Sequence, residues 1–179
     1  CAVWEHVDDG SGETDIHGQQ FDERAVLLVS PDIDICTASG LQGNACVSAW
    51  DDQAVVAWED HRDYSTQGID VYGNVLDLST GNPEFTPMTA RALSTAAYDQ
   101  LSPDADFGFA RDLMYVCWED HRDTLTSGAD IYAQGLACAD PTQFRWGTGG
   151  QRVSAYRGDQ VLPRIAGEVV VWPVSYTHL

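Results

Sequence analysis

Residues 57–63 of this chain read Ala-Trp-Glu-Asp-His-Arg-Asp, and residues 117–123 read Cys-Trp-Glu-Asp-His-Arg-Asp. The six shared residues lie 60 positions apart, and six consecutive identities are very improbable by chance. A second match follows each stretch: Gly-Ile-Asp-Val-Tyr at 68–72 and Gly-Ala-Asp-Ile-Tyr at 128–132. The chain is therefore a tandem repeat, and this repeat decides the fold.

The repeats are anchored at tryptophans spaced by 54, 60 and 54 residues. The anchors are Trp4, Trp58, Trp118 and Trp172. The first copy is the most divergent, since His17 stands where the second copy has Tyr72. The motif breaks off after the last anchor, where Pro173 would end strand pairing. We interpret residues 1–172 as one repeat array and residues 173–179 as an off-pattern tail that is not native to the protein.

Each repeat contains short apolar runs separated by turn-forming residues. The runs at 54–58, 113–118 and 169–172 are rich in β-branched and aromatic residues and predict strands buried on both faces. The Asp-Ile-Tyr segments predict the next strand, joined to the first by a polar hairpin loop. Four short strands in each unit of 54 to 60 residues predict an all-β fold, a β-propeller fragment of about three four-stranded antiparallel blades. A string of small β-domains is the alternative architecture.

The composition limits the classes of ligand. Among 179 residues, 28 acidic side chains oppose 9 basic ones, all of them arginine, and the formal net charge is −19. Such a surface repels phosphate backbones and anionic lipids, so we expect neither nucleic acid nor membrane insertion. Cations, neutral sugars and basic proteins remain as ligand classes. No apolar run approaches the roughly 20 residues that a membrane helix needs.

The five cysteines include no Cys-x-x-Cys pair, which argues against a zinc knuckle. Cys36 and Cys46 bracket a loop rich in Gly, Ser and Asn and form a candidate disulfide. Cys117 lies inside an apolar run and reads as a buried core residue. The odd number of cysteines and the start inside a repeat lead us to expect a chain cut from a longer protein, whose remaining blades would be its partners.

The repeated motif has a structural interpretation. We expect its tryptophans to fill the wedge between blades and its first aspartates to accept turn N–H groups. We expect Arg62 to pair with Asp70, and Arg122 with Asp130, across the mouth of each hairpin. A catalytic set normally occurs once in a ring, whereas a folding device occurs in every blade. The residues with this structural role are Trp58, Asp60, Arg62, Asp70, Tyr72, Trp118, Asp120, Arg122, Asp130 and Tyr132.

Trp-Glu-Asp-x-Arg followed by Asp-Ile-Tyr resembles the repeats of TolB-like β-propellers, most clearly over residues 45–136. The resemblance implies four-stranded blades in a ring of about six to eight. It also implies a bacterial-type protein that is secreted, periplasmic or exposed at the cell surface. Families with this repeat are mostly binding or scaffold modules, sometimes fused to hydrolases.

Calcium is the one cofactor that the sequence suggests, because carboxylates gather in loops that contain glycine and hard oxygen ligands suit this ion. The candidate ligands are Asp60, Asp63, Asp70, Asp120, Asp123 and Asp130, with Asp8, Asp9 and Asp15 in the first repeat. No EF-hand loop is present, and the other interpretation is a solvated acidic loop with an arginine clamp.

No catalytic set stands out. His-Arg-Asp occurs twice but lacks the asparagine and the phosphate loop of protein kinases, and there is no Gly-x-Ser-x-Gly elbow. Glu5, Glu59 and Glu119 follow the first three anchor tryptophans, and we expect exposed or rim positions for them in preference to the carboxylate pair of a glycosidase. The favoured function is a non-enzymatic extracellular module that binds or scaffolds a protein or carbohydrate. The alternatives are the propeller part of a secreted hydrolase with catalytic residues elsewhere, and a purely structural surface repeat.

Overall fold

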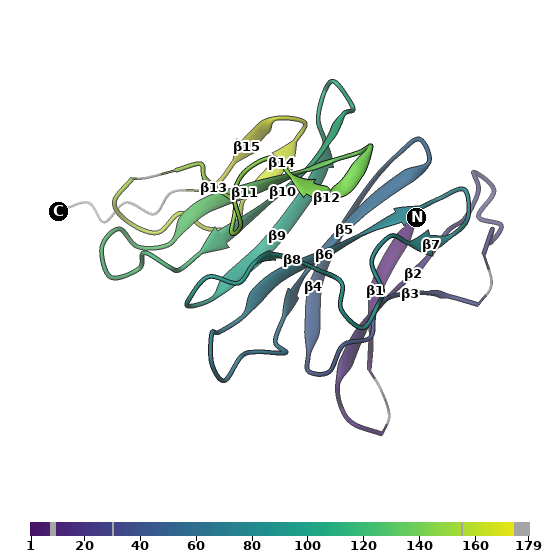
Figure 1. Cartoon of the computed structure of the whole chain (residues 1–179), viewed down its shortest axis with the longest axis horizontal. Coiled ribbons are helices and arrows are strands. Elements are labelled where there is room, and N and C mark those ends of the chain that lie inside the picture. Colours follow the sequence, from purple (N-terminus) through teal and green to yellow (C-terminus); the bar gives the residue numbers. More distant parts are fainter. Residues whose placement is uncertain (8–9, 30, 155, 174–179) are drawn as a thin grey trace.

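The computed structural model describes residues 1–7, 10–29, 31–154 and 156–173, and these residues form strands joined by turns and loops (Figure 1). In chain order the strands are β1 (Ala2–Val7), β2 (Thr14–Gln19), β3 (Ile33–Cys36), β4 (Gln42–Trp50), β5 (Gln53–Asp60), β6 (Asp70–Asp77), β7 (Asn82–Pro83), β8 (Arg91–Ser94), β9 (Gln100–Phe107), β10 (Leu113–Asp120), β11 (Asp130–Ala137), β12 (Asp140–Phe144), β13 (Gln151–Arg152), β14 (Arg164–Ala166) and β15 (Val169–Val171). Of the off-pattern tail, only Pro173 is among the described residues. The part of the chain that the structure describes has no helix long and apolar enough to cross a membrane.

The strands form antiparallel sheets that follow one another across the molecule in chain order (Figure 1). Sheet two has the order β4-β5-β6, with its outer position divided between β7 and β8; sheet three has β9-β10-β11, with β12 and β13 outermost. Sheet one contains β1-β2-β3, and sheet four contains β14-β15. The innermost strands of neighbouring sheets lie against each other, β4 against β9 and β9 against β14. The prediction of an all-β propeller fragment of about three four-stranded blades is confirmed.

The sequence repeat is also a repeat in strand register. In β5 and β6 the cross-strand partners are Trp58 with Tyr72 and Asp60 with Asp70; in β10 and β11 they are Trp118 with Tyr132 and Asp120 with Asp130. In sheet one Trp4 faces His17 in the corresponding place. Residues that match in sequence therefore occupy equivalent positions. A difference in sequence between two repeats is then a side-chain change at the same position of the same strand arrangement.

The apolar core lies between neighbouring sheets. The Trp58 indole is fully buried in a cluster that includes Ile16 and Ile35 of sheet one. The Trp118 indole is fully buried in a second cluster that includes Val55 and Leu93 of sheet two. Each ring thus fills the space between its own sheet and the preceding one, where large aromatic side chains contribute most of the buried area.

The cysteines are all free thiols. The predicted Cys36–Cys46 disulfide is not formed, because Cys36 belongs to the core between sheets one and two, whereas Cys46 packs against the core between sheets two and three. Cys117 is fully buried. Burial raises the pKa of the Cys117 thiol to about 12, so this thiol stays protonated and chemically inert.

Candidate functional site

The repeated motif builds a buried polar unit at the end of the tryptophan strand. In sheet three the Asp120 carboxylate accepts hydrogen bonds from the Trp118 indole N–H at 2.8 Å and from the Arg122 backbone N–H at 3.0 Å. The Arg122 guanidinium donates to the same carboxylate through Nε at 2.8 Å and Nη2 at 2.6 Å. Sheet two repeats the unit. The Asp60 carboxylate accepts from the Trp58 indole N–H at 3.0 Å and from the Arg62 backbone N–H at 3.0 Å. The Arg62 guanidinium donates to it through Nε at 2.8 Å and Nη2 at 2.6 Å. Both aspartates are fully buried, so these charge-assisted bonds compensate their lost hydration.

The predicted pairing of Arg62 with Asp70, and of Arg122 with Asp130, is therefore wrong. The turn after the tryptophan strand folds each arginine back onto the aspartate two residues earlier. While its edge donates to the carboxylate, one face of each guanidinium lies over the repeated tyrosine. The arginine Cζ is 4.0 Å from the ring centroid of Tyr72 in sheet two and 3.9 Å from that of Tyr132 in sheet three. Cation–π contact of this kind stabilises the guanidinium in the orientation in which its edge meets the carboxylate.

The arginine of the motif also contacts the preceding sheet. The Arg122 Nη2 donates to the Ser94 hydroxyl of β8, in the preceding sheet, at 3.1 Å and to the Gly149 carbonyl at 2.9 Å. The Arg62 Nη2 lies 3.7 Å from the Cys36 sulfur of β3, also in the preceding sheet. In sheets two and three, where the full motif is present, it thus connects each sheet with the preceding one.

The three recurring glutamates also serve the scaffold. The Glu5, Glu59 and Glu119 carboxylates accept backbone N–H groups of the next sheet's innermost segment, from Asn44 at 2.6 Å, Ser102 at 2.7 Å and Leu162 at 3.3 Å respectively. The three N–H groups belong to residues with positive φ, between 51° and 55°. Each glutamate therefore fixes an unusual backbone bend in its neighbour. The expected exposed or rim position is wrong for Glu119, which is buried.

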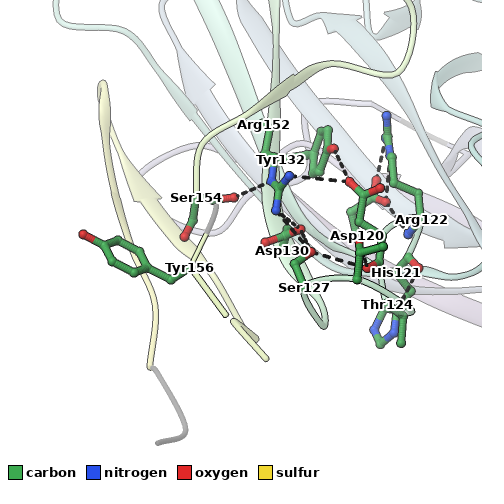
Figure 2. A network of polar contacts seen from close by, with 12 residues as sticks. Asp120, His121, Arg122, Thr124, Ser127, Asp130, Tyr132, Arg152, Ser154 and Tyr156 are labelled. Carbon is green, nitrogen blue, oxygen red and sulfur yellow. Dashed lines mark hydrogen bonds and ion pairs between the residues drawn. The ribbon is translucent and has the colours of Figure 1, made fainter. Parts of the chain in front are cut away.

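A second polar network lies around Asp130 (Figure 2). The Arg152 Nη2 is 2.6 Å from the Asp130 carboxylate, and the Ser127 hydroxyl donates to that carboxylate at 2.8 Å. The Arg152 Nη1 lies 3.8 Å from Asp123, and Nε donates to the Ser154 carbonyl at 2.9 Å. The sequence did not predict Arg152 as a partner of Asp130. The strand register shows that Arg152 on β13 lies opposite Tyr132 on β11, two residues after Asp130.

Sheet two keeps the aspartate of this network but not its arginine. Ala92 lies opposite Tyr72, in the register position that Arg152 occupies opposite Tyr132. Asp70 is fully buried, and among the described residues neither of its carboxylate oxygens has a hydrogen-bond partner. Burial, together with the nearby charges of Asp63 and Asp60, raises the pKa of Asp70 to about 7.

Asp70 should make stability depend on pH in a direction opposite to that of an ordinary paired carboxylate. Because its folded-state pKa is raised above the unfolded value, its contribution is present at acidic pH and is lost as pH rises from about 4 towards 7. Relative to Asp70→Asn, the wild-type chain should lose about 1–2 kcal/mol of unfolding free energy between pH 5 and pH 8, allowing for solvent screening. Urea unfolding at several pH values measures this difference. An unfolding free energy that runs parallel in both chains across this range would show that Asp70 is ionised throughout.

A groove of about 540 Å³ lies between the hairpin loops of sheets two and three. Its lining residues are Tyr64, Ser65, Thr66, Gln67, Gly68, Tyr98, Asp99, His121, Thr124 and Leu125. The loop at 61–69 is held by Asp99, whose carboxylate accepts the Ile69 N–H at 3.0 Å. Gly68 is required there because its φ is +103° and a Cβ would lie 2.7 Å from an Asp99 oxygen.

The groove's exposed side chains were not among the sequence-predicted site residues. Tyr64 and Tyr98 are exposed, yet the positions 60 residues further on carry Thr124 and Gly158. The signal that could have found them is this difference, since residues that change within a repeated loop are free of the scaffold's requirements.

The calcium candidates do not converge. Within the described ranges no three His, Cys, Asp or Glu side chains are arranged to hold a metal ion. Asp60 and Asp120 are committed to their tryptophan and arginine partners. Asp8 and Asp9 lie outside the described residues. Calcium binding by these loops stays a prediction.

No protein-family model matches this chain, and no curated protein matches it. Among solved structures, it is similar to an α-L-arabinanase of Penicillium chrysogenum complexed with arabinobiose, with 13% identity, a TM-score of 0.40 and coverage of 90% of this chain and 53% of that one. It is also similar to a chain described as a glycoside hydrolase, with 13% identity, a TM-score of 0.41 and coverage of 88% of this chain and 38% of that one. The chain spans about half or less of the length of these structures, and at this distance the likeness assigns no activity.

Proposed function

We propose that this chain is part of an extracellular TolB-like β-propeller that binds a neutral carbohydrate in the groove between the loops of sheets two and three, without catalysing a reaction. The observation that carries the proposal is that exposed aromatic and hydroxyl side chains line this groove on top of a rigidly repeated frame. Rigid scaffolds with variable loops at one end commonly serve binding.

The chemistry of the groove suits a sugar. Tyr64 and Tyr98 offer aromatic faces for the C–H faces of a pyranose or furanose ring. Thr66, Thr124 and His121 offer hydrogen-bonding groups for sugar hydroxyls. The net charge of −19 disfavours polyanions but does not repel an uncharged glycan.

The carboxylates argue against catalysis in the described part of the chain. A glycosidase needs two carboxyl groups facing one substrate bond. The recurring glutamates instead accept backbone N–H groups of the next sheet, and the recurring aspartates hold tryptophan and arginine. Their repetition and their contacts both favour a structural role.

Tyr98→Ala and Tyr64→Ala should each weaken glycan binding by about tenfold, because each removes an exposed ring on which a sugar can stack. The measurement is affinity electrophoresis and calorimetry against soluble arabinan, xylan, galactan and β-glucan. Tyr156→Ala is the matched control, since Tyr156 is exposed but lies outside the groove. Equal affinity in all four chains would refute the groove as the site, and release of reducing ends by the wild-type chain would favour the hydrolase alternative.

A further inference from the structure

We propose that the buried carboxylate of Asp70 is a binding site for the guanidinium group of an arginine supplied by another molecule. The site lies in sheet two, at the place where sheet three uses its own Arg152. It is separate from the carbohydrate proposal in chemistry and in the residues that carry it, although both use the loop at 61–69.

Sheet three shows what this place accommodates. The Arg152 side chain enters from the outer strand β13 and remains 31% exposed while its Nη2 reaches the fully buried Asp130. Its Nη1 lies 3.8 Å from Asp123. Its Nε donates to the Ser154 carbonyl (Figure 2). A planar fork with donors in three directions bonds Asp130 and the Ser154 carbonyl and still faces Asp123, which is a property of guanidinium.

Sheet two retains the acceptors at the corresponding positions. Asp63, Asp70 and Ser94 stand 60 residues before Asp123, Asp130 and Ser154. The matched strand registers place Asp70 and Tyr72 on β6 as they place Asp130 and Tyr132 on β11. The cation is replaced by Ala92 on the outer strand β8.

The consequence is a buried carboxylate without compensation. In the described part of the chain, both oxygens of Asp70 are buried and lack hydrogen-bond partners. In contrast, one oxygen of Asp130 pairs with the Arg152 guanidinium and accepts a hydrogen bond from the Ser127 hydroxyl. A buried, unpaired carboxyl group is costly, and a charged donor that pairs with it recovers that cost on binding. The nearby arginine, Arg62, is committed to Asp60.

Guanidinium fits this site better than the other cations that an acidic protein attracts. A divalent metal prefers several converging oxygen ligands, and no three acidic, cysteine or histidine side chains among the described residues provide them. An ammonium group is compact and strongly hydrated, so it cannot address separated acceptors in one plane. The exposed Asp63 lies at the solvent side and can attract the incoming positive charge.

The test uses the 179-residue chain, calorimetry and two-dimensional NMR at pH 8. Methylguanidinium chloride should bind at one site, and methylammonium and calcium chlorides at matched ionic strength should bind at least tenfold more weakly. Ala92→Arg should abolish methylguanidinium binding because it places the missing guanidinium in the chain itself. Asp70→Asn should also abolish it and covers the case in which Ala92→Arg fails to fold.

Sheet three provides the matched control. Arg152→Ala should create a second methylguanidinium site at Asp130, so that the stoichiometry rises from one to two. Because the Asp70 carboxyl must ionise to bind, affinity should fall by about tenfold between pH 8 and pH 6. Tyr98→Ala should leave this binding unchanged, which separates its outcome from that of the glycan experiment.

The source of the guanidinium is distinguished with peptides. Free L-arginine and a Gly-Arg-Gly peptide should compete with methylguanidinium, and Gly-Lys-Gly should not. Tighter binding of the peptide than of L-arginine would assign the site to a protein partner, and the reverse would assign it to the free amino acid. Methylguanidinium binding that persists in both Ala92→Arg and Asp70→Asn, tighter binding of calcium, or no binding at all would overturn the proposal.

Discussion

Replacing Asp120 with alanine is expected to lower the free energy of unfolding by about 3–5 kcal/mol, the cost of removing one partner from a buried ion pair. The Asp120 carboxylate accepts hydrogen bonds from the Trp118 indole and from three nitrogens of Arg122. The substitution leaves a largely buried guanidinium without its counter-ion and a buried indole N–H without an acceptor. Urea unfolding followed by tryptophan fluorescence measures the loss.

Two variants calibrate this result. Glu84→Ala removes an exposed carboxylate and should change stability by less than about 0.5 kcal/mol. Asp120→Asn keeps the acceptor oxygen for the indole but loses the charge, and it should fall between the two. A cost below about 1 kcal/mol for Asp120→Ala would mean that the motif does not hold the sheets together.

The architecture could be predicted from the sequence because the repeat and the strand periodicity indicate the same order of strands and loops. Once Trp58 and Trp118 are aligned, the apolar runs, the hairpin loops and the Asp-Ile-Tyr strands fall into a common order. Each of these is a local property of the chain, and successive blades need only their neighbours for stability. The described strands follow that order, including the partial first and last sheets.

The choice of arginine partners could not be predicted in the same way. Asp60 and Asp70 are cross-strand neighbours, so both lie within reach of Arg62. The Trp58 indole N–H and the turn backbone already orient Asp60, and this decides the pairing. Which aspartate the arginine pairs with depends on the direction of the side chains, and spacing along the chain does not specify that direction.

The groove and the proposed guanidinium site at Asp70 could not be predicted from the sequence for a different reason. A search for repeats rewards positions that agree, whereas both sites arise where repeats disagree: Tyr98 against Gly158, and Ala92 against Arg152. The structure makes these differences interpretable because the register fixes which positions correspond. Repetition thus identifies the scaffold, and departures from it identify candidate sites.

Trp118→Ala is expected to cost about 3–5 kcal/mol as well, here through the loss of buried area and the cavity that remains. Its ring is fully buried in the core between sheets two and three, stacked on Tyr132 with ring centroids 6.4 Å apart. Loss of this contact should weaken the coupling between sheets more than the sheets themselves, so the thermal transition should broaden as well as shift to lower temperature.

Trp50→Ala is the matched control for this broadening. Trp50 is 49% exposed and the Arg111 guanidinium carbon lies 4.0 Å from its ring centroid, so its removal should cost about 1 kcal/mol or less. Calorimetry separates the two effects because the ratio of van't Hoff to calorimetric enthalpy falls when sheets unfold independently. A Trp118→Ala chain that melted earlier but with an unchanged ratio would show that the innermost strands β4, β9 and β14 carry the coupling. The tryptophan would then stabilise its own sheet without joining it to the next.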